Sequence, residues 1–464
     1  MMSNNYDFVK TDELNTAVIN PDTGFWMILN STALNIFKLY VEGKNEKEIV
    51  RLLSSHYGIP KDIIQQDVAL CLDNIKREIS KYNTAYNKKG ENNGFNRQLT
   101  IHITNSCNLN CPYCFKDANH ISKRKNLLSV ADLYNAISVA IEQGFGEIVL
   151  TGGEPTIRTD FEEMLDQLSV FKSKAKFSLV TNGTTMLKDT VIDKMCSFFD
   201  SIQISLDSFD EEKNSVTRGK GSLAKISSFV NQLKRNGYKN FYYACTPYTE
   251  GMKYPSTVQD LPMMLRYAAN TGSMGLYVNH LKPDGRMQVD DYLNFNEESF
   301  WSSVDKMYDE FSILYKAGFN KKDLGIDFTC AVAGDYAHIA SQNTHSPNCG
   351  LGINELALDS DGNVYPCSAL IFDEFIQGNI FNENFGDIIV RTREKFNQLT
   401  VDKIEKCNGC SLRMICGGGC RAMAYYIKGD LNKCDPNCDS CRKRILKWMN
   451  MTLISTANSL KDRK

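Results

Sequence analysis

Cys107-Asn-Leu-Asn-Cys111-Pro-Tyr-Cys114 is the stretch around which the rest of the chain can be organised. Its thiols have the spacing C-x3-C-x2-C, so they can bind three irons of a cubane [4Fe-4S] cluster and leave the fourth iron without a protein ligand. An open metal position distinguishes a reactive site from a structural one. Half of a zinc site is the alternative interpretation: zinc usually closes its shell with a fourth Cys or His, and His102 and His120 are close in sequence.

A glycine-rich loop supports the cluster interpretation. The strand-like residues 147–151 run into Gly152-Gly153-Glu154-Pro155. Together, the cysteine triplet and this loop resemble the signature of the radical S-adenosylmethionine (SAM) enzymes. The resemblance implies that SAM chelates the free iron through its amino and carboxylate groups. It also implies that Gly152 and Gly153 let the backbone approach the methionine part of SAM, and that the segment ending in Glu154 meets the ammonium group.

Length and composition describe an ordinary globular protein of two or three domains. The chain has 464 residues, 42% hydrophobic and 23% charged. With 53 basic and 55 acidic residues its net charge is −2, which indicates neither nucleic-acid nor membrane binding. The first twenty residues lack the apolar core of a secretory signal, and no run approaches the ~18 apolar residues of a membrane span. We therefore expect a cytoplasmic protein.

Sixteen cysteines in a cytoplasmic chain require an explanation. In a reducing compartment disulfides are rare, so metal binding is the better interpretation. Apart from Cys71, Cys196 and Cys245, every cysteine belongs to the triplet or to the C-terminal third. These three are expected to be buried or incidental thiols.

Residues 1–80 are expected to form a small α+β, winged-helix-like domain. Two candidate strands, at 16–20 and 24–29, flank a turn at 21–24, and three helix signals follow. Ser31 is expected to cap the first helix, Asn45 and Glu48 form a capping-box pattern for the second, and the third begins near Asp62. Residues 81–97 are polar and aperiodic, which is typical of a linker.

A hairpin followed by three short helices resembles the PqqD-like domain, which recognises precursors of ribosomally made peptides. The resemblance implies that a leader peptide adds to the edge strand at 25–29 and packs on a helix face containing Val68, Leu72 and Ile75. A DNA-binding winged helix or a plain packing domain is the alternative. Asp62, Asp67 and Asp73 on the third helix argue against DNA.

Residues 98–320 alternate between strand and helix patterns. Strands are expected at 99–103, 147–151, 177–181, 202–206, 240–246 and 275–280, with a helix after each, and the first of these helices begins at Ser129. Such alternation predicts a parallel α/β sheet with right-handed crossovers. It matches the partial (β/α)6 TIM barrel of radical SAM enzymes.

The candidate site residues fall where predicted strands end, which is where barrel active sites collect. The family resemblance adds cofactor contacts at these ends, with an aromatic residue beside the adenine of SAM and an arginine paired with its carboxylate. The candidates beyond the triplet and the Gly152–Glu154 loop are Tyr113, Asn182, Ser205, Asp207 and Arg218 in Thr217-Arg218-Gly219. Asn182 can equally be a turn residue, and Asp207 a helix cap.

A second field of cysteines occupies residues 321–464. The pattern C-x12-G-x4-C, C-x2-C-x5-C-x3-C and a final C resembles the SPASM domain, a twin-cluster extension of radical SAM enzymes. Two zinc ribbons are the alternative. A hairpin is expected at 354–358 and 363–365, closed by residues 359–362. The resemblance implies that a first auxiliary cluster binds Cys349, Cys367 and Cys420, and that a second binds Cys407, Cys410, Cys416 and Cys438.

Three further cysteines have open assignments. Cys330 lies where some members supply a fourth ligand to the first auxiliary cluster and others leave an iron open. Cys434 and Cys441 flank Cys438, so the last ligand of the second auxiliary cluster is not settled by spacing.

Taken together, these resemblances imply an enzyme with SAM and three [4Fe-4S] clusters as cofactors. It would form thioether crosslinks of the sactipeptide or ranthipeptide type, from a Cys sulfur to a carbon of a ribosomally synthesised precursor peptide. Its partners would be that peptide and a low-potential electron donor of the flavodoxin or ferredoxin type. Three alternatives stay open: a carbon–carbon crosslinking maturase, an anaerobic sulfatase-maturing enzyme, and a multi-cluster electron carrier. The last leaves the Gly152–Glu154 loop unexplained.

Overall fold

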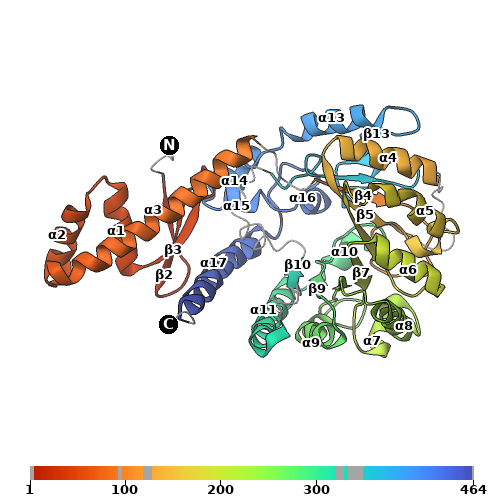
Figure 1. Cartoon of the computed structure of the whole chain (residues 1–464), viewed down its shortest axis with the longest axis horizontal. Helices are drawn as coiled ribbons and strands as arrows, with labels where there is room; N and C mark the ends of the chain where they lie inside the picture. Colours follow the sequence, from red (N-terminus) through yellow and green to blue (C-terminus); the bar gives the residue numbers. More distant parts are fainter. Residues whose placement is uncertain (1–4, 92–96, 119–127, 320–328, 333–347, 462–464) are drawn as a thin grey trace.

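The computed structural model describes residues 5–91, 97–118, 128–319, 329–332 and 348–461. A small N-terminal domain lies at one end of the molecule and a large α/β body at the other, with the C-terminal helix between them (Figure 1). In the described residues, no helix has both the length and the apolar character needed to cross a membrane.

The N-terminal domain confirms the predicted hairpin and adds one strand to it. An antiparallel sheet has the order β1-β2-β3, and three helices cover one of its faces. Asn45 and Glu48 form the predicted capping box, whereas Asn30, not Ser31, caps the first helix. The elements are β1 (Asp7–Lys10), β2 (Asn15–Ile19), β3 (Trp26–Asn30), α1 (Ser31–Val41), α2 (Glu46–Tyr57) and α3 (Lys61–Glu91).

Two expectations about the third helix were wrong. Helix α3 continues to Glu91, so residues 81–91 are helical and not an irregular linker. Val68, Leu72 and Ile75 are at most 2% exposed and form the core of this domain, so they offer no face to a peptide. The helical periodicity of Val68, Leu72 and Ile75 reflects their burial against the sheet and helices of this same domain.

The α/β body is built on the six predicted strands, all parallel, in the order β4-β5-β6-β7-β8-β9. Figure 1 shows the helices along the outer side of this curved sheet. Ile148, Leu150 and Leu179 are fully buried in the shared core. The strands are β4 (Arg97–His102), β5 (Phe145–Thr151), β6 (Lys176–Thr181), β7 (Ser201–Ser205), β8 (Phe241–Cys245) and β9 (Gly275–Val278).

The helices of the body agree with the predicted ones except in one place. Ser129 caps the first of them through a capping box with Asp132, as its position predicts. Thr217 and Arg218 lie in the last turn of α7, where a loop was expected. The helices are α4 (Val130–Glu142), α5 (Phe161–Leu168), α6 (Asp189–Phe198), α7 (Glu211–Arg218), α8 (Ser222–Arg235), α9 (Leu261–Thr271), α10 (Val289–Tyr292) and α11 (Glu297–Leu314).

The segment beyond residue 320 extends this sheet at both ends. Strand β10 (Thr329–Val332) pairs in parallel with β9, and β11 (Glu355–Leu358) pairs in parallel with β4. The predicted hairpin is present as β11 and β12 (Asn363–Tyr365), and β13 (Gly378–Asn379) follows it. The expected boundary at 320 therefore does not separate two sheets.

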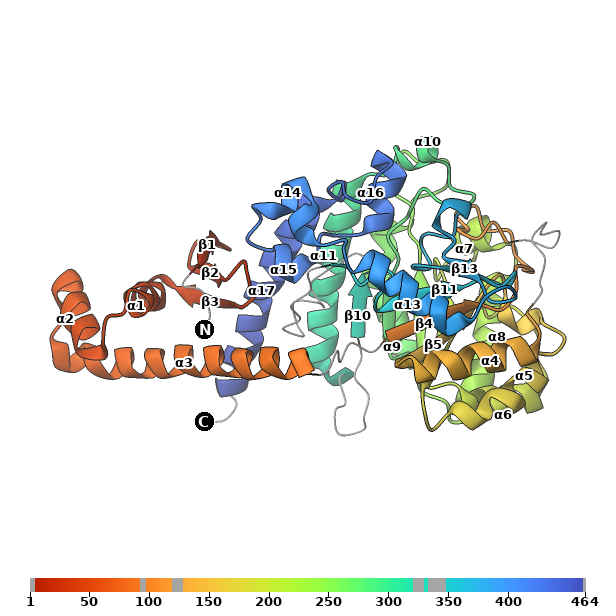
Figure 2. The same ribbon diagram turned by 90° about the horizontal axis from the view of Figure 1, so that it is seen from above.

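The rest of the C-terminal segment is helical and supports the N-terminal hairpin. Ala17 and Ile28 of the hairpin pack against Ile415, Ile445 and further apolar side chains of α15 and α17. Figure 2 shows the hairpin between α1 and α17. The helices are α13 (Phe385–Phe396), α14 (Glu405–Asn408), α15 (Arg413–Cys416), α16 (Arg421–Lys428) and α17 (Cys438–Lys461).

Candidate functional site

The cysteine triplet follows β4, at the carboxyl end of the parallel sheet. Burial raises the pKa of Cys107 to about 12 and that of Cys111 to about 11. As free thiols both would be protonated at neutral pH, whereas metal ligation requires thiolates. The three thiols lie on one short loop with the spacing C-x3-C-x2-C, so each can bind a different iron of one cubane. The donor set therefore fits an iron–sulfur cluster.

Gly152 and Gly153 bind the β5 loop to the cysteine loop. The Gly153 N–H donates to the Thr104 carbonyl at 2.6 Å. A Cβ atom at Gly152 would collide with the Thr104 carbonyl, and one at Gly153 with the Ser106 carbonyl. The glycine pair is thus required for backbone packing against the residues that lead into Cys107. This contact was not expected from the resemblance, which assigned the pair to SAM.

The Glu154 carboxylate is fully buried and connects the ends of β5 and β6. It accepts hydrogen bonds from the Thr156 and Thr181 hydroxyls and from the Asn182 N–H, at 2.6 to 2.7 Å. Asn182 in turn donates its side-chain amide to Asn108, inside the cysteine loop, at 2.8 Å. These bonds hold the loop after β6 against the triplet.

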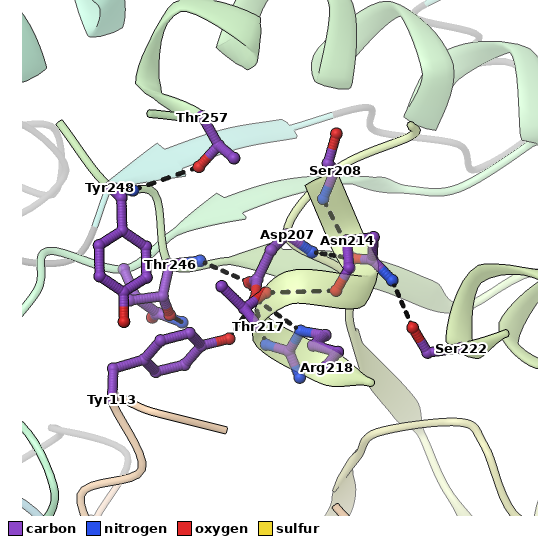
Figure 3. A network of polar contacts seen from close by, with 11 residues as sticks. Tyr113, Asp207, Ser208, Asn214, Thr217, Arg218, Ser222, Thr246, Tyr248 and Thr257 are labelled. Carbon is purple, nitrogen blue, oxygen red and sulfur yellow. Dashed lines mark hydrogen bonds and ion pairs between the residues drawn. The ribbon is translucent and has the colours of Figure 1, made fainter. Parts of the chain in front are cut away.

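Asp207, at the end of β7, is the centre of a second network (Figure 3). Arg218 from α7 pairs with it at 2.9 Å, the Thr217 hydroxyl donates to it at 2.7 Å, and the Thr246 N–H donates at 3.1 Å. The Tyr113 hydroxyl, from the cysteine loop, donates to the same carboxylate. Burial raises the pKa of Tyr113 well above its ordinary value, so the phenol stays a donor.

The network around Asp207 fixes the positions of Arg218 and Tyr113. The Arg218 guanidinium lies over the Tyr113 ring, 5.7 Å from its centre, and pairs with Asp207. Asp207 thus orients an arginine and a tyrosine beside the triplet, while Ser205 ends β7 next to them. Direct contacts of Ser205, Asp207 and Arg218 with SAM stay predictions.

Asp207→Asn is expected to lower the free energy of unfolding by about 1.5–3 kcal/mol, the worth of hydrogen bonds to a charged group. Asparagine keeps an acceptor oxygen but leaves the buried Arg218 charge without its carboxylate. Urea unfolding followed by circular dichroism measures the change. Asp210→Asn is the matched control, because Asp210 caps α7 from an exposed position and asparagine caps equally well. Equal stability of the two variants would contradict the assigned role.

The structure brings the predicted cysteines of the first auxiliary site together. Cys349, Cys367 and Cys420 line one cavity of about 240 Å³, between the end of β9 and the C-terminal segment. Lys282 and Arg421 line the same cavity. Cys330 belongs to strand β10, but the structure does not describe the position of its side chain.

The four cysteines predicted for the second auxiliary site also share a cavity. Cys407, Cys410, Cys416 and Cys438 line it, together with Gly418, Gly419 and Cys441. The thiol of Cys434 donates a hydrogen bond to the Asp435 carbonyl at 3.4 Å. Cys441 also borders the first cavity and belongs to the core that holds the hairpin.

The described thiols fit clusters better than zinc. Among the residues with described side chains, no three His, Cys, Asp or Glu groups converge closely enough to hold one metal ion. Zinc requires such convergence, whereas a cubane binds each thiolate through a different iron. His120, considered as a zinc ligand, lies outside the described residues.

Comparisons with known families agree with this geometry. The model of the radical SAM superfamily matches residues 101–254, and the model of an iron–sulfur cluster-binding domain, SPASM, matches residues 349–411. The chain contains a radical SAM domain and a SPASM domain. The model of coenzyme PQQ synthesis protein D (PqqD) matches residues 15–78. The radical SAM and SPASM domains imply SAM and [4Fe-4S] clusters as cofactors.

Relatives cover most of the radical SAM/SPASM chain. The mycofactocin maturase MftC of Mycolicibacterium smegmatis is 26% identical over 347 residues, 73% of this chain and 82% of its own. Streptococcus suis SuiB bound to SAM has a TM-score of 0.58 at 16% identity, over 94% of this chain and 99% of its own. Native anSMEcpe with bound AdoMet has a TM-score of 0.60 at 19% identity, over 78% of this chain and 99% of its own. The last two likenesses concern the fold.

Sequence reasoning missed the loop after β9 of this radical SAM/SPASM protein. Arg286 donates to the Cys111 and Ala118 carbonyls and pairs with Asp117 at 2.8 Å, which ties the loop to the triplet. The rule that functional residues follow barrel strands pointed to this loop as well. The resemblance assigned no residue there, so Lys282 and Arg286 were not considered.

Proposed function

We propose that this protein is a peptide maturase that installs intramolecular thioether crosslinks in a ribosomally synthesised precursor peptide. The observation that carries the proposal is a PqqD hairpin whose strand β3 forms one edge of the described sheet, packed beside the auxiliary cysteines of a radical SAM/SPASM body. Asp22 in the hairpin turn pairs with Arg413 at 2.6 Å. Arg413 lies between Cys410 and Cys416, so this ion pair joins the N-terminal hairpin to the cysteines of the second auxiliary site.

Strand β3 is the outer strand of the described three-stranded sheet, and its outward backbone groups can pair with an extended peptide. The Asn20 N–H donates to the Phe25 carbonyl, so in the alternating antiparallel pattern Met27 and Leu29 point their backbone groups toward β2. Trp26 and Ile28 therefore point theirs outward, where β3 forms the edge of the sheet. A leader peptide that pairs with this edge would extend the sheet by one strand. SuiB has been solved bound to the precursor peptide SuiA, which supports a peptide partner.

Ile28→Pro is expected to weaken binding of a leader-bearing peptide at least tenfold. Proline removes the outward N–H of the edge strand and leaves the ladder between β2 and β3 intact. Fluorescence anisotropy of a labelled precursor with the full-length chain measures the affinity. Ile28→Val keeps the N–H and the apolar contact with α17 and should bind like the native chain. SAM cleavage without peptide should be equal in all three, and unchanged peptide affinity in Ile28→Pro would exclude this edge.

The reaction follows from the cofactors and from what the chain does around them. SAM and its cluster supply hydrogen-atom abstraction when bound, and the auxiliary clusters supply electron transfer. Thioether formation breaks one C–H and one S–H bond, forms one C–S bond, and removes two protons and two electrons from the peptide. The buried networks of Glu154 and Asp207 hold the loops around the triplet in place and limit access of water. A flavodoxin- or ferredoxin-type protein would supply the low-potential electron.

Mass spectrometry of a cysteine-containing precursor after anaerobic reaction tests this proposal. A loss of two hydrogens per crosslink, together with the loss of one thiol that iodoacetamide can alkylate, is expected for a thioether. A carbon–carbon crosslink would also lose two hydrogens but would leave every thiol free. A peptide that returns unchanged, while SAM is cleaved, would reject peptide maturation.

A further inference from the structure

The loop that follows β9 lies between the cysteine triplet and the first auxiliary site. We define residues 279–287 as the bridging loop. At one end, the Arg286 N–H donates to the Cys114 carbonyl at 3.1 Å, and a Cβ at Gly285 would collide with that carbonyl. At the other end, His280 and Lys282 line the cavity of the first auxiliary site. One short loop therefore contacts both cysteine sites.

The bridging loop is held firmly, which fixes the position of Lys282. Asp284 is buried and accepts a hydrogen bond from the Tyr426 hydroxyl of α16 at 3.2 Å. The Met287 N–H closes a turn on the Asp284 carbonyl at 3.1 Å. Asp284 and Arg286, which follow Lys282 in the bridging loop, are thus both anchored, and this restricts the position of Lys282.

Lys282 differs from the other charged groups that line this cavity. Arg421 directs its guanidinium to the carbonyls of Gly418, Leu431 and Lys433. The carboxylates are also occupied, that of Glu355 by Ser368 and that of Asp435 by the Cys420 N–H. The Lys282 ammonium has no hydrogen bond or ion pair to another described side chain.

Lys282 shares its cavity with the three thiols of the first auxiliary site, Cys349, Cys367 and Cys420. A lysine ammonium carries a positive charge at neutral pH. A positive charge that lines a cavity attracts any negative charge bound there. A cluster ligated by thiolates becomes more negative when it is reduced, so a neighbouring cation stabilises the reduced state.

We propose that Lys282 raises the reduction potential of the cluster bound by Cys349, Cys367 and Cys420, and so makes it the acceptor of the electron left after bond formation. Net charge near the sulfurs is one of the determinants of cluster potential. The assignment of the electron's origin rests on the proposed function, whereas the effect on the potential requires only the cluster. Lys282 acts on the cluster as a positioned charge and is not a catalytic residue.

Potentiometric titration of the full-length, cluster-loaded protein, followed by electron paramagnetic resonance, tests the proposal. In Lys282→Met, one cluster should become at least tenfold harder to reduce, a fall of 59 mV for one electron. The other clusters should not change. Lys282→Arg keeps the charge and should retain the native potential. Lys225→Met, at an exposed position of α8, is the matched control and should be silent.

A second readout connects the potential to turnover. Lys282→Met should form more deoxyadenosine per crosslinked peptide than the native chain, because the surplus electron leaves less readily. Iron content and circular dichroism equal to native show that the variant is folded. Unchanged potentials in Lys282→Met, or equal potentials in the Met and Arg variants, would overturn the proposal. If Lys282→Met lowers the potential as expected but the native protein leaves every peptide unmodified, only the proposed function is rejected.

Discussion

Cleavage of SAM to deoxyadenosine is expected to fall to background when Cys107, Cys111 and Cys114 are replaced by alanine. The three thiols follow β4, and we predict that they hold the cluster whose fourth iron is open to SAM. If the chain binds three clusters, its iron content should fall from about twelve to about eight per chain. Deoxyadenosine is measured by liquid chromatography after anaerobic incubation with dithionite.

A single distant cysteine provides the control for this experiment. Cys196 lies in α6, partly buried against the core and outside every cysteine site described. Cys196→Ala should keep both the iron and the deoxyadenosine. If the triple variant still cleaved SAM with added reductant, the assignment of the triplet would be wrong, whatever the state of the auxiliary clusters.

Lys116→Met is expected to destabilise the protein by about 3–5 kcal/mol, the cost of leaving a buried charge without its partner. The Lys116 ammonium pairs with the Asp359 carboxylate at 2.6 Å, and both side chains are fully buried. Lys116 follows the triplet by two residues, and Asp359 begins the turn between β11 and β12. The pair therefore joins the triplet loop to the C-terminal hairpin. Urea unfolding of the full-length protein measures the loss.

A double-variant cycle shows whether the loss comes from the unpaired charge. Lys116→Met combined with Asp359→Asn removes both charges, so it should recover most of the stability that Lys116→Met loses. If the double variant lost as much stability as the two single variants together, the pairing of Lys116 with Asp359 would be contradicted. The neighbouring pair Arg391–Glu383 is exposed, and its disruption by Arg391→Met should cost less than about 1 kcal/mol.

The same pair predicts a dependence of stability on pH. Burial alone would raise the pKa of Asp359, but Lys116, His102 and the Ser360 N–H together outweigh burial, so the pKa lies below its ordinary value. Because the folded-state pKa is the lower one, the stabilisation is present above the unfolded value of about 3.9 and is lost as pH falls through the folded value. Lys116→Met should lose this acid-sensitive component.

The sequence by itself determined the parts of this protein that local patterns encode. Helical and alternating periodicity identified the six parallel strands and most of their helices, because burial of one face leaves a regular mark on the chain. Capping residues such as Ser129 and Asn45 located helix starts. Cysteine spacing marked the triplet, because its three thiols lie within one short loop, whereas the two auxiliary sets were assigned from the resemblance to the SPASM domain. The structure places the two auxiliary sets in separate cavities.

Only the tertiary structure decided how these parts meet. Lys116 and Asp359 are 243 positions apart, and neither residue type signals a buried partner. Lys282 resembled any surface lysine until the loop after β9 was placed against the auxiliary cavity. The resemblance to the PqqD-like domain assigned Val68 and Leu72 to a peptide. Their helical periodicity reports that the face is buried but not what buries it. Hydrophobic burial and charge pairing act between whichever surfaces the chain brings together, so their partners become visible only in three dimensions.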